Sequence, residues 1–372
     1  MKSLFVVFIF CATWVAGAAA ETPPQATSAA EKAALTATVD GKSGYDSGMG
    51  VLATPGQQIS VTLSPLLGLA TASVAEAGAR AQASIAEQYE WSVDRGALRD
   101  VTGNALVFEC PKEPGTCVLT GRMTRGVTIK SAGSKDVTVI KETTWTLHVL
   151  TQYPYDREGK GTIEGYPVGI YPNESGPRAV DTVRSNADLY RPPQWFVRVT
   201  RSERSIRISP HFTIGEFCSS LSDEDVTFVA ISPRLVDRLE RIHAKLVTPD
   251  RPHPRVAILR AFISPNEADQ LRRKGLAMTE FSRHIYGDAA AIIVDTDGNG
   301  VMDDLNGDGK GDFGDVDVLS RVVEQVERES GVYGGMGLHG GPTDALMPKT
   351  PYLSIDCRGR KARWSSGAKN AE

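Results

Sequence analysis

The sequence predicts an α+β protein in which an all-β domain precedes a domain that mixes helices and strands. Residues 46–150 contain short runs of alternating apolar and polar residues separated by turns. The clearest run places Trp145, Leu147 and Val149 on one face of a strand. Residues 194–365 combine strand patterns with helical patterns, so the two regions together indicate an α+β arrangement.

The first 20 residues have the parts of a secretory signal peptide. Lys2 supplies a positive charge, residues 4–15 are apolar, and residues 18–20 are a run of Ala suited to cleavage. The apolar run is too short to span a bilayer, and no later segment approaches that length. We therefore expect an exported protein, periplasmic or extracellular, that has no membrane span.

Composition divides the mature chain into ordered domains and flexible segments. Residues 21–45, rich in Ala, Thr, Pro and Gly, are expected to be a flexible lead-in. Residues 46–150 are interpreted as an immunoglobulin-like β-sandwich. Residues 151–193, rich in Tyr, Pro and Gly, are expected to be an irregular connector, and residues 366–372 a flexible tail.

Four cysteines follow the signal peptide, and an exported protein can form disulfides. Cys110 and Cys117 flank the turn-rich hexapeptide PKEPGT, so we expect them to join as a disulfide across a hairpin. Cys218 and Cys357 could pair or remain as buried thiols, and no CxxC pattern points to a metal.

The second domain is predicted from helix and strand signals taken in order. Ser232 and Pro233 begin a helix whose apolar stripe is Leu235, Leu239, Ile242 and Leu246. Strand 255–262, helix 266–274 and the buried strand 289–294 follow. A helix over 316–330 has an apolar face, and residues 352–357 form a late strand.

The segment 295–315 predicts calcium binding. Starting at Asp304, oxygen-bearing side chains occupy the first, third, fifth, ninth and twelfth positions of a calcium loop, with Gly309 at the sixth. These side chains are Asp304, Asn306, Asp308, Asp312 and Asp315. An overlapping run predicts a partial site or a second cation, and its oxygen donors are Asp295, Asp297, Asn299 and Asp303. Seven Asp so close together repel one another without a cation, so we expect structural calcium.

Five blocks of the second domain carry a family resemblance. They are HFTIGEFCS at 211–219, SPRLVDRLERIHAKL at 232–246, ILRAFISPNEA at 258–268, SRHIYGDAAAIIVD at 282–295 and YLSIDCRGRKARW at 352–364. In this order they resemble the zinc D-alanyl-D-alanine carboxypeptidases, the VanY-like metallopeptidases that trim peptidoglycan stem peptides. The resemblance covers residues 194–365 and implies a carboxypeptidase-like fold, with 295–315 as an insertion.

The departures from that family fall on its zinc site. The family's first zinc ligand corresponds to His284, but the second falls on Ala291 and the third on Ser354. The substrate-holding Arg of the family falls on Ile263, whereas Asp356 is kept from the second catalytic block. A catalytic zinc needs about three protein ligands and an open position, so His284 alone is not sufficient.

Three functions remain open on the sequence. The first is an envelope protein whose peptidase-like domain has lost its zinc and binds peptidoglycan or a partner protein, with calcium as a structural ion. The second is a divergent zinc peptidase that uses His284 with substitute ligands converging within about 4 Å, drawn from Asp288, His339 and Asp356. The third is a calcium-dependent adhesion or scaffold module that binds through its β-sandwich. A net charge of −4 without a Lys/Arg block argues against nucleic acid as a partner.

Overall fold

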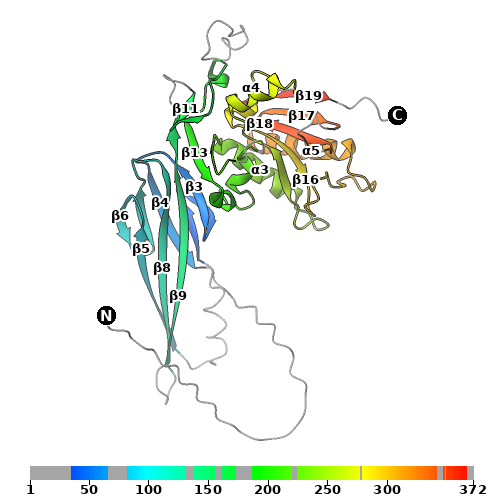
Figure 1. Cartoon of the computed structure of the whole chain (residues 1–372). Coiled ribbons are helices and arrows are strands. Elements are labelled where there is room, and N and C mark those ends of the chain that lie inside the picture. Colours follow the sequence, from blue (N-terminus) through cyan, green and yellow to red (C-terminus); the bar gives the residue numbers. More distant parts are fainter. Residues whose placement is uncertain are drawn as a thin grey trace, which may run out of the picture. The chain divides into compact units, whose positions relative to one another are not determined.

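The structure is a computed structural model that describes residues 35–65, 82–130, 137–155, 161–172, 187–219, 224–276, 279–341, 347 and 349–366. Within these ranges the chain is rich in strand and contains α-helices in its second half, so the predicted α+β class is confirmed (Figure 1). The predicted signal peptide lies outside the described residues. None of the described helices is both long and apolar enough to cross a bilayer.

Two sheets form the first domain and share one apolar core. The first sheet has the order β2-β1-β4-β7-β6, made of β1 (Leu35–Val39), β2 (Lys42–Asp46), β4 (Gln58–Pro65), β6 (Ala97–Thr102) and β7 (Ala105–Glu109). The second has the order β3-β9-β8-β5, made of β3 (Met49–Ala53), β5 (Gln82–Val93), β8 (Gly115–Lys130) and β9 (Val137–Thr151). Trp145 and Leu147 of β9 are fully buried in the shared core, as their alternation predicts.

The first domain begins earlier than its composition suggested. Leu35, Ala37 and Val39 of β1 are buried, and β1 pairs with β2 and β4. The prediction of a flexible lead-in over 21–45 is therefore wrong for residues 35–45. The small-residue composition of the lead-in concealed a strand whose alternate apolar positions face the core.

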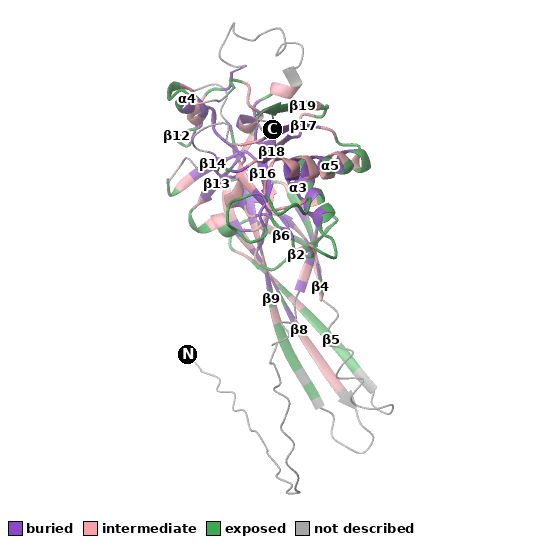
Figure 2. Cartoon of the chain, turned by 90° about the vertical axis from the view of Figure 1, so that its right-hand side faces the viewer, coloured by how far each residue is buried: buried purple, intermediate pink, exposed green. Residues whose placement is uncertain are grey.

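Strands β8 and β9 are longer than the opposite sheet can cover. They contain 16 and 15 residues, whereas the strands of the first sheet contain between 5 and 8. Buried residues therefore gather at one end of β8 and β9, whereas the other end is half-buried on β8 and mostly exposed on β9 (Figure 2). Ile140 on the uncovered part of β9 is 68% exposed.

The expected hairpin disulfide is not formed in the structure, where Cys110 and Cys117 are both buried thiols. Cys110 follows β7 in one sheet, and Cys117 lies on β8 in the other. The hexapeptide between them crosses between sheets and does not close a hairpin. Burial raises the pKa of each thiol to about 12, so both are protonated at neutral pH. Cys218 and Cys357 are buried thiols as well.

The expected connector contributes to the core of the second domain. Tyr155, Val168 and Tyr171 are buried among the apolar residues of that domain, so the irregular connector over 151–193 is only partly correct. Its regular elements are β10 (Tyr153–Pro154), β11 (Thr162–Ile163), β12 (Tyr166–Pro167) and the 3-10 turn η1 (Ala187–Tyr190). Strand β10 joins β13 (Trp195–Thr200) and β14 (Val226–Val229) in a three-stranded sheet.

A second five-stranded sheet carries the helices. Its order is β15-β16-β18-β17-β19, made of β15 (Val256–Arg260), β16 (Ala289–Val294), β18 (Tyr352–Asp356), β17 (Gly335–His339) and β19 (Ala362–Ser366). Neighbouring strands are antiparallel except for the parallel pair β17 and β19. The helices are α3 (Pro233–Leu246), α4 (Pro265–Arg273) and α5 (Phe313–Ser330), with the 3-10 turns η2 (Ser202–Ser205), η3 (Ile214–Phe217) and η4 (Arg283–Tyr286). Helix α5 packs on β17 and β18, and α3 packs on α5.

Local sequence explains where the helices begin. Helix α3 starts with Pro233 after Ser232 and buries the predicted stripe that includes Leu235 and Leu239. Helix α5 starts at the end of the acidic segment, where the Asp312 carboxylate accepts a hydrogen bond from the Gly314 amide at 2.7 Å. The Asp315 carboxylate accepts one from the Asp312 amide in return, so the two form a capping box.

Candidate functional site

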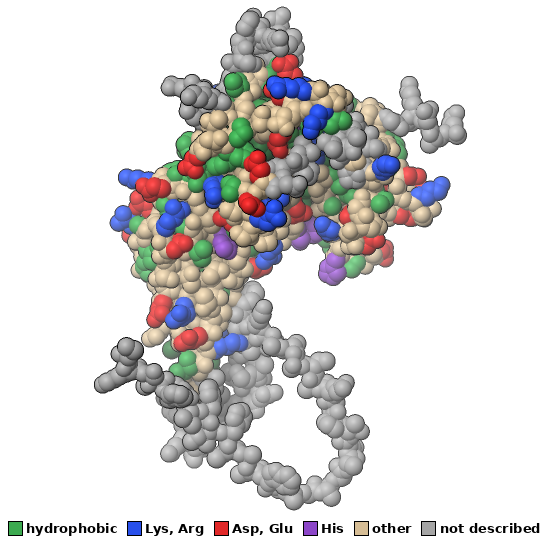
Figure 3. All heavy atoms as spheres, in the orientation of Figure 1, with side chains coloured by type: hydrophobic (Ala, Val, Ile, Leu, Met, Phe, Trp, Pro, Cys, Tyr) green, Lys and Arg blue, Asp and Glu red, His purple; other side chains and the backbone are tan. Residues whose placement is uncertain are grey.

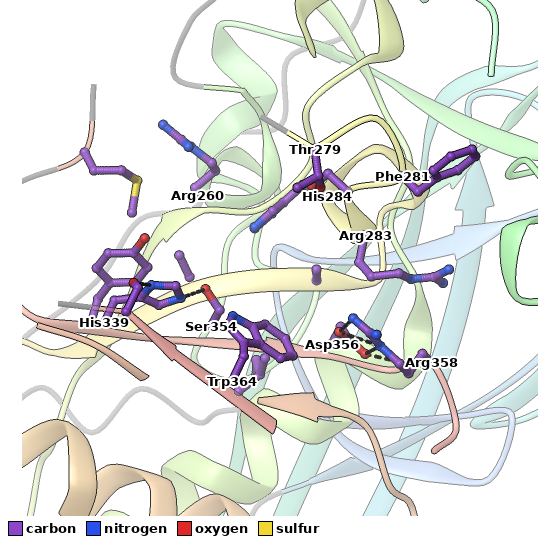
Figure 4. A pocket seen from close by; sticks show the side chains of 17 residues that line it. Arg260, Thr279, Phe281, Arg283, His284, His339, Ser354, Asp356, Arg358 and Trp364 are labelled. Carbon is purple, nitrogen blue, oxygen red and sulfur yellow. Dashed lines mark hydrogen bonds and ion pairs between the residues drawn. The ribbon is translucent and has the colours of Figure 1, made fainter. Parts of the chain in front are cut away.

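A cavity of about 670 Å³ opens over β16 and β18 of the second domain. His284, Ala291 and Ser354, the three positions at which the family resemblance places zinc ligands, all line it (Figure 4). Ala291 and Ser354 are direct partners in the register of β16 and β18. The structure therefore brings these three positions to one space, although only His284 carries a side chain that suits zinc.

His284 has the orientation of a metal-binding imidazole. Its Nδ1 lies 2.6 Å from the carbonyl oxygen of Ala261, so Nδ1 carries the proton that it donates, and Nε2 keeps its lone pair. Metal-binding histidines are commonly held this way by a carbonyl on the other nitrogen. Burial lowers the pKa of His284 to about 4, and the ring is neutral at physiological pH.

The turn that carries His284 depends on a glycine. Gly287 ends η4 in the left-handed region at φ 69°. A Cβ at this position would lie 2.3 Å from the carbonyl oxygen of Ala230, so only glycine fits without moving the backbone. This close approach sets the position of η4, and with it His284, beside β16.

Across the cavity, Ser354 is engaged by a second histidine (Figure 4). The Ser354 hydroxyl lies 3.1 Å from Nε2 of His339, and Nδ1 of His339 lies 2.7 Å from the Ser366 hydroxyl. The His339 ring also stacks on Tyr352 with centroids 4.4 Å apart. Burial lowers the pKa of His339, so it is a neutral ring with both nitrogens already in hydrogen bonds.

The carboxylates near the cavity are paired with arginines. Asp288 accepts a hydrogen bond from Nε of Arg283 at 3.0 Å, and a second nitrogen of Arg283 completes the ion pair. Asp356 is bound by Arg358 through Nε and a terminal nitrogen, at 2.9 and 2.6 Å. Burial opposes the ionisation of Asp356, but the hydrogen bonds and charge of Arg358 outweigh it and hold its pKa below the usual value. Burial raises the pKa of Asp288, against the opposing effect of Arg283.

These contacts keep the proposed substitute zinc ligands apart. In the part of the chain that the structure describes, His284, Asp288, His339 and Asp356 do not form a group of three donor atoms close enough to share a metal ion. The convergence that a divergent zinc site requires is therefore not observed, and Asp288 does not line the cavity. Asp356 does line it, as half of an ion pair.

The acidic segment after β16, in contrast, brings carboxylates together. Donor oxygens of Asp295, Asp297 and Asp303 lie within 4.8 Å of one another. Asp295 is only 3% exposed, and its two oxygens accept hydrogen bonds from the amides of Asn299 and Gly300 at 2.9 and 3.1 Å. Arg255 approaches Asp295 at 3.8 Å. This is the run for which the sequence predicted a partial site or a second cation.

Residues 304–315, which match the calcium loop best, have a curled backbone. Their carboxylates do not lie as close together as those of Asp295, Asp297 and Asp303. Asp304 accepts hydrogen bonds from the amides of Gly307 and Gly309 at 2.6 and 2.7 Å, and these bonds lower its pKa. Asp315 is fully buried and accepts the Leu305 amide at 2.7 Å. Among the described residues, Asp304, Asp308, Asp312 and Asp315 supply no group of three carboxylates within 4.8 Å. Asn306 lies among them, with its side-chain nitrogen 3.3 Å from Asp308.

Two sets of candidate residues escaped sequence reasoning. Arg260 and Trp364 line the cavity, but neither belongs to a spacing pattern that points to a site. His211, Glu240 and His243 form a second group of potential metal ligands outside the cavity. The signal available in the sequence was the Glu-x-x-His spacing on the predicted helix, which places Glu240 and His243 on one face.

Comparisons with known proteins do not identify a family. A scan against protein-family models gave no match, and a search of curated proteins gave none either. One solved structure is similar over a limited region, a nucleoside hydrolase-related hypothetical protein from Saccharophagus degradans. It is 12% identical, the match covers 32% of this chain and 25% of that one, and the TM-score is 0.18. A likeness this weak carries no argument about function.

Proposed function

We propose that this chain is an exported cell-envelope protein whose second domain derives from a zinc D-alanyl-D-alanine carboxypeptidase and binds peptidoglycan stem peptides without cleaving them. The observation that carries the proposal is the cavity in which His284, Ala291 and Ser354 meet. The oriented imidazole is kept, whereas the two positions opposite one another on β16 and β18 hold side chains that cannot complete a zinc site.

The cavity has the size and chemistry for a short anionic peptide. Its volume of about 670 Å³ is within the range of about 300–1,000 Å³ that is usual for ligand pockets. Arg260 lines it, so a terminal carboxylate would meet a cationic group, and Nε2 of His284 would accept a hydrogen bond from a peptide N–H. Trp364 is 39% exposed, with the Arg358 guanidinium 5.5 Å from its ring, and offers an aromatic surface to the ligand.

Trp364 reaches the cavity because its neighbour has no side chain. Gly337 pairs with Trp364 in the parallel register of β17 and β19. A Cβ at Gly337 would lie 2.0 Å from Nε1 of Trp364, so any other residue would displace the ring. Gly337→Ala therefore offers a way to disturb the aromatic wall without removing a charge.

The proposal is tested by titrating the mature protein with a stem pentapeptide that ends in D-Ala-D-Ala, with binding followed by calorimetry. Arg260→Gln and Trp364→Ala should each raise the dissociation constant about tenfold, which corresponds to about 1.4 kcal/mol. Arg201→Gln is the matched control, because Arg201 is an exposed arginine paired with Asp225 on the surface. No binding by the wild type, or equal loss in the control, would remove the proposal.

Structural calcium belongs to the same proposal. The buried Asp295 with Asp297 and Asp303, joined by the curled loop that follows, supports one or two cations in the segment 295–315. Calcium suits this segment because hard oxygen donors dominate it, and extracellular calcium would fill even a weak site of about 10⁻⁴–10⁻³ M. Bound calcium would brace the chain between β16 and α5.

A second candidate is adhesion through the first domain, which we interpret as an immunoglobulin-like sandwich. The uncovered ends of β5, β8 and β9 favour it, because they expose Ile85 and Ile140 at 48% and 68%. In this sandwich, β3 pairs with β9 in parallel. Loss of partner binding on deleting residues 35–150, but not in Trp364→Ala, would favour this candidate over binding in the cavity. A surface of mixed charge suits a peptidoglycan or a protein partner, and acidic and basic side chains are intermingled on the face drawn in Figure 3.

A further inference from the structure

A group of metal-binding side chains lies outside the cavity, between the segment before η3 and helix α3. His211 belongs to that segment, and Glu240 and His243 lie one helical turn apart on α3. One donor atom from each of the three lies within 4.8 Å of the others. None of the three lines the cavity described above, so the group is independent of the proposed peptide site.

Hydrogen bonds hold this group in place. The Glu240 carboxylate accepts the His211 amide at 2.9 Å through one oxygen, and its other oxygen lies 2.7 Å from Nδ1 of His211. His243 is 8% exposed and donates a hydrogen bond to the carbonyl oxygen of Pro254. His243 therefore has one nitrogen engaged by an acceptor outside the group and one left for a ligand, as in metal sites whose histidines are oriented in this way.

The electrostatics of the group suit a bound dication. The two imidazole rings stack with centroids 3.5 Å apart, so protonating both would place two positive charges together. Neutral imidazole beside a carboxylate is the protonation state that a metal requires.

We propose that His211, Glu240 and His243 form a structural binding site for a transition-metal dication, with zinc the best match. Two imidazoles and one carboxylate are ligands that zinc takes in proteins, and water supplies the remaining position because the side chain of His211 is 46% exposed. The two rings lie within 23° of parallel, so their lone pairs do not meet at one point. Metal binding therefore turns the exposed ring of His211 while buried His243 stays in place.

The site would connect two parts of the second domain. The backbone before His211 is joined to η3 by the Ile214 amide, which donates to the carbonyl oxygen of Ile206 at 2.8 Å, and α3 packs on α5. A metal shared by His211 and α3 would add a cross-link between these elements. It would also make zinc in the purified protein a poor indicator of peptidase chemistry, since the ion would not lie in the cavity.

The test is titration of the calcium-loaded full mature chain with zinc, in competition with a chromophoric chelator, and with cobalt, whose visible absorption reports its ligands. We expect one zinc per chain. His211→Ala and His243→Ala should each weaken binding by about 100-fold, because each removes one of three protein ligands. His211 is exposed enough that its variant should keep the melting temperature of the metal-free wild type.

Two matched variants locate the ion. His253→Ala removes an exposed histidine near α3, and His284→Ala removes the imidazole of the cavity. Both should bind zinc as the wild type does. The proposal is overturned if the wild type retains no zinc after dialysis, if His211→Ala and His243→Ala bind it unchanged, or if His284→Ala abolishes binding. That last outcome would also count against the proposed function, whereas the first two would leave it intact.

Discussion

The cavity and the acidic segment differ in how their carboxylates are neutralised. Near the cavity, Asp288 and Asp356 each pair closely with an arginine, and both pairs are buried or half-buried. In the segment, Asp295, Asp297 and Asp303 lie together with backbone amides as their main partners, and Arg255 stands 3.8 Å from Asp295. A carboxylate already paired with arginine has little to gain from a metal, whereas gathered carboxylates repel one another until a cation joins them.

A complete sequence motif therefore does not by itself imply that its side chains converge on one point. Around the cavity, the two carboxylates that could have served as substitute zinc ligands, Asp288 and Asp356, are bound by arginine. In the segment the less complete motif is the one whose carboxylates meet. The predictions that follow test this distinction between paired and gathered carboxylates, from the largest expected effect to the smallest.

The largest effect is expected at a buried paired carboxylate. Glu327 is 1% exposed and is bound by Arg238, which is 3% exposed, at 2.7 Å. Glu327→Ala should cost about 3–5 kcal/mol of unfolding free energy, because it leaves a buried arginine without its partner. Denaturant unfolding in the presence and absence of calcium should show the same loss.

The control for that variant is Glu329→Ala. Glu329 lies on α5, as Glu327 does, and pairs with Lys245 of α3 on the surface, where both side chains are exposed. Its removal should leave the unfolding midpoint nearly unchanged. If both variants lost stability equally, burial of the pair would not be the cause.

Removal of calcium should have the next largest effect. At a calcium concentration 100 times the dissociation constant, binding adds about 2.7 kcal/mol of stability, which a chelator removes. Differential scanning calorimetry should show the second domain melting at a lower temperature with chelator, and Asp295→Ala should abolish the calcium response.

Asp225→Ala is the matched control for Asp295→Ala. The side chain of Asp225 is 88% exposed and pairs only with Arg201 among the contacts described, so its variant should respond to calcium as the wild type does. An identical melting curve with calcium and with chelator would show that the gathered carboxylates hold no calcium under these conditions.

The histidine of the cavity predicts a pH-dependent effect that is smaller over any one pH unit. The folded pKa of His284 is lowered to about 4 from 6.5, so between these values the unfolded chain binds the proton and the folded chain does not. Stability should therefore fall as the pH drops from about 6.5 to 4, by at most about 1.4 kcal/mol per pH unit for this one group.

His284→Phe should flatten that pH dependence, whereas His253→Ala should not. The effect is partial because burial lowers the pKa of His243 and of His339 in the same direction. Urea unfolding at several pH values would measure the slopes. A slope in His284→Phe as steep as in the wild type would mean that the ring titrates normally when folded.

The smallest effect is expected at Ser354. Ser354→Ala removes the hydrogen bond to His339, which keeps its contact with Ser366 and its stacking on Tyr352. We expect a loss of about 0.5–1.5 kcal/mol in unfolding free energy, with peptide binding retained. A loss of peptide binding comparable to that of Arg260→Gln would instead place the Ser354 hydroxyl in contact with the ligand.

Much of the fold followed from local pattern. Alternation identified β9 through Trp145, and the apolar stripe with Pro233 identified α3. The spacing of the acidic segment predicted its curled backbone, in which Gly307 and Gly309 adopt φ near 85°. These features depend on residues close together in the chain, which is why sequence alone reached them.

The missed features depend on tertiary contacts. Cys110 and Cys117 looked like a hairpin because sequence does not show that β7 and β8 belong to different sheets. Loop spacing did not reveal that the carboxylates of Asp295, Asp297 and Asp303 converge. His211 and His243 are 32 positions apart, and only the packing of the His211 segment on α3 brings their rings together.

The most direct test of the central claim is cleavage of a D-Ala-D-Ala stem pentapeptide by the purified mature protein, with zinc and calcium supplied, measured as released D-Ala. The positive control is the double variant Ala291→Asp, Ser354→His, which places zinc-binding side chains in the cavity beside His284. We predict that the wild-type protein binds the peptide and releases no D-Ala above the rate without protein. Zinc-dependent release that His284→Ala abolishes would contradict the account and show that the cavity is a working peptidase site.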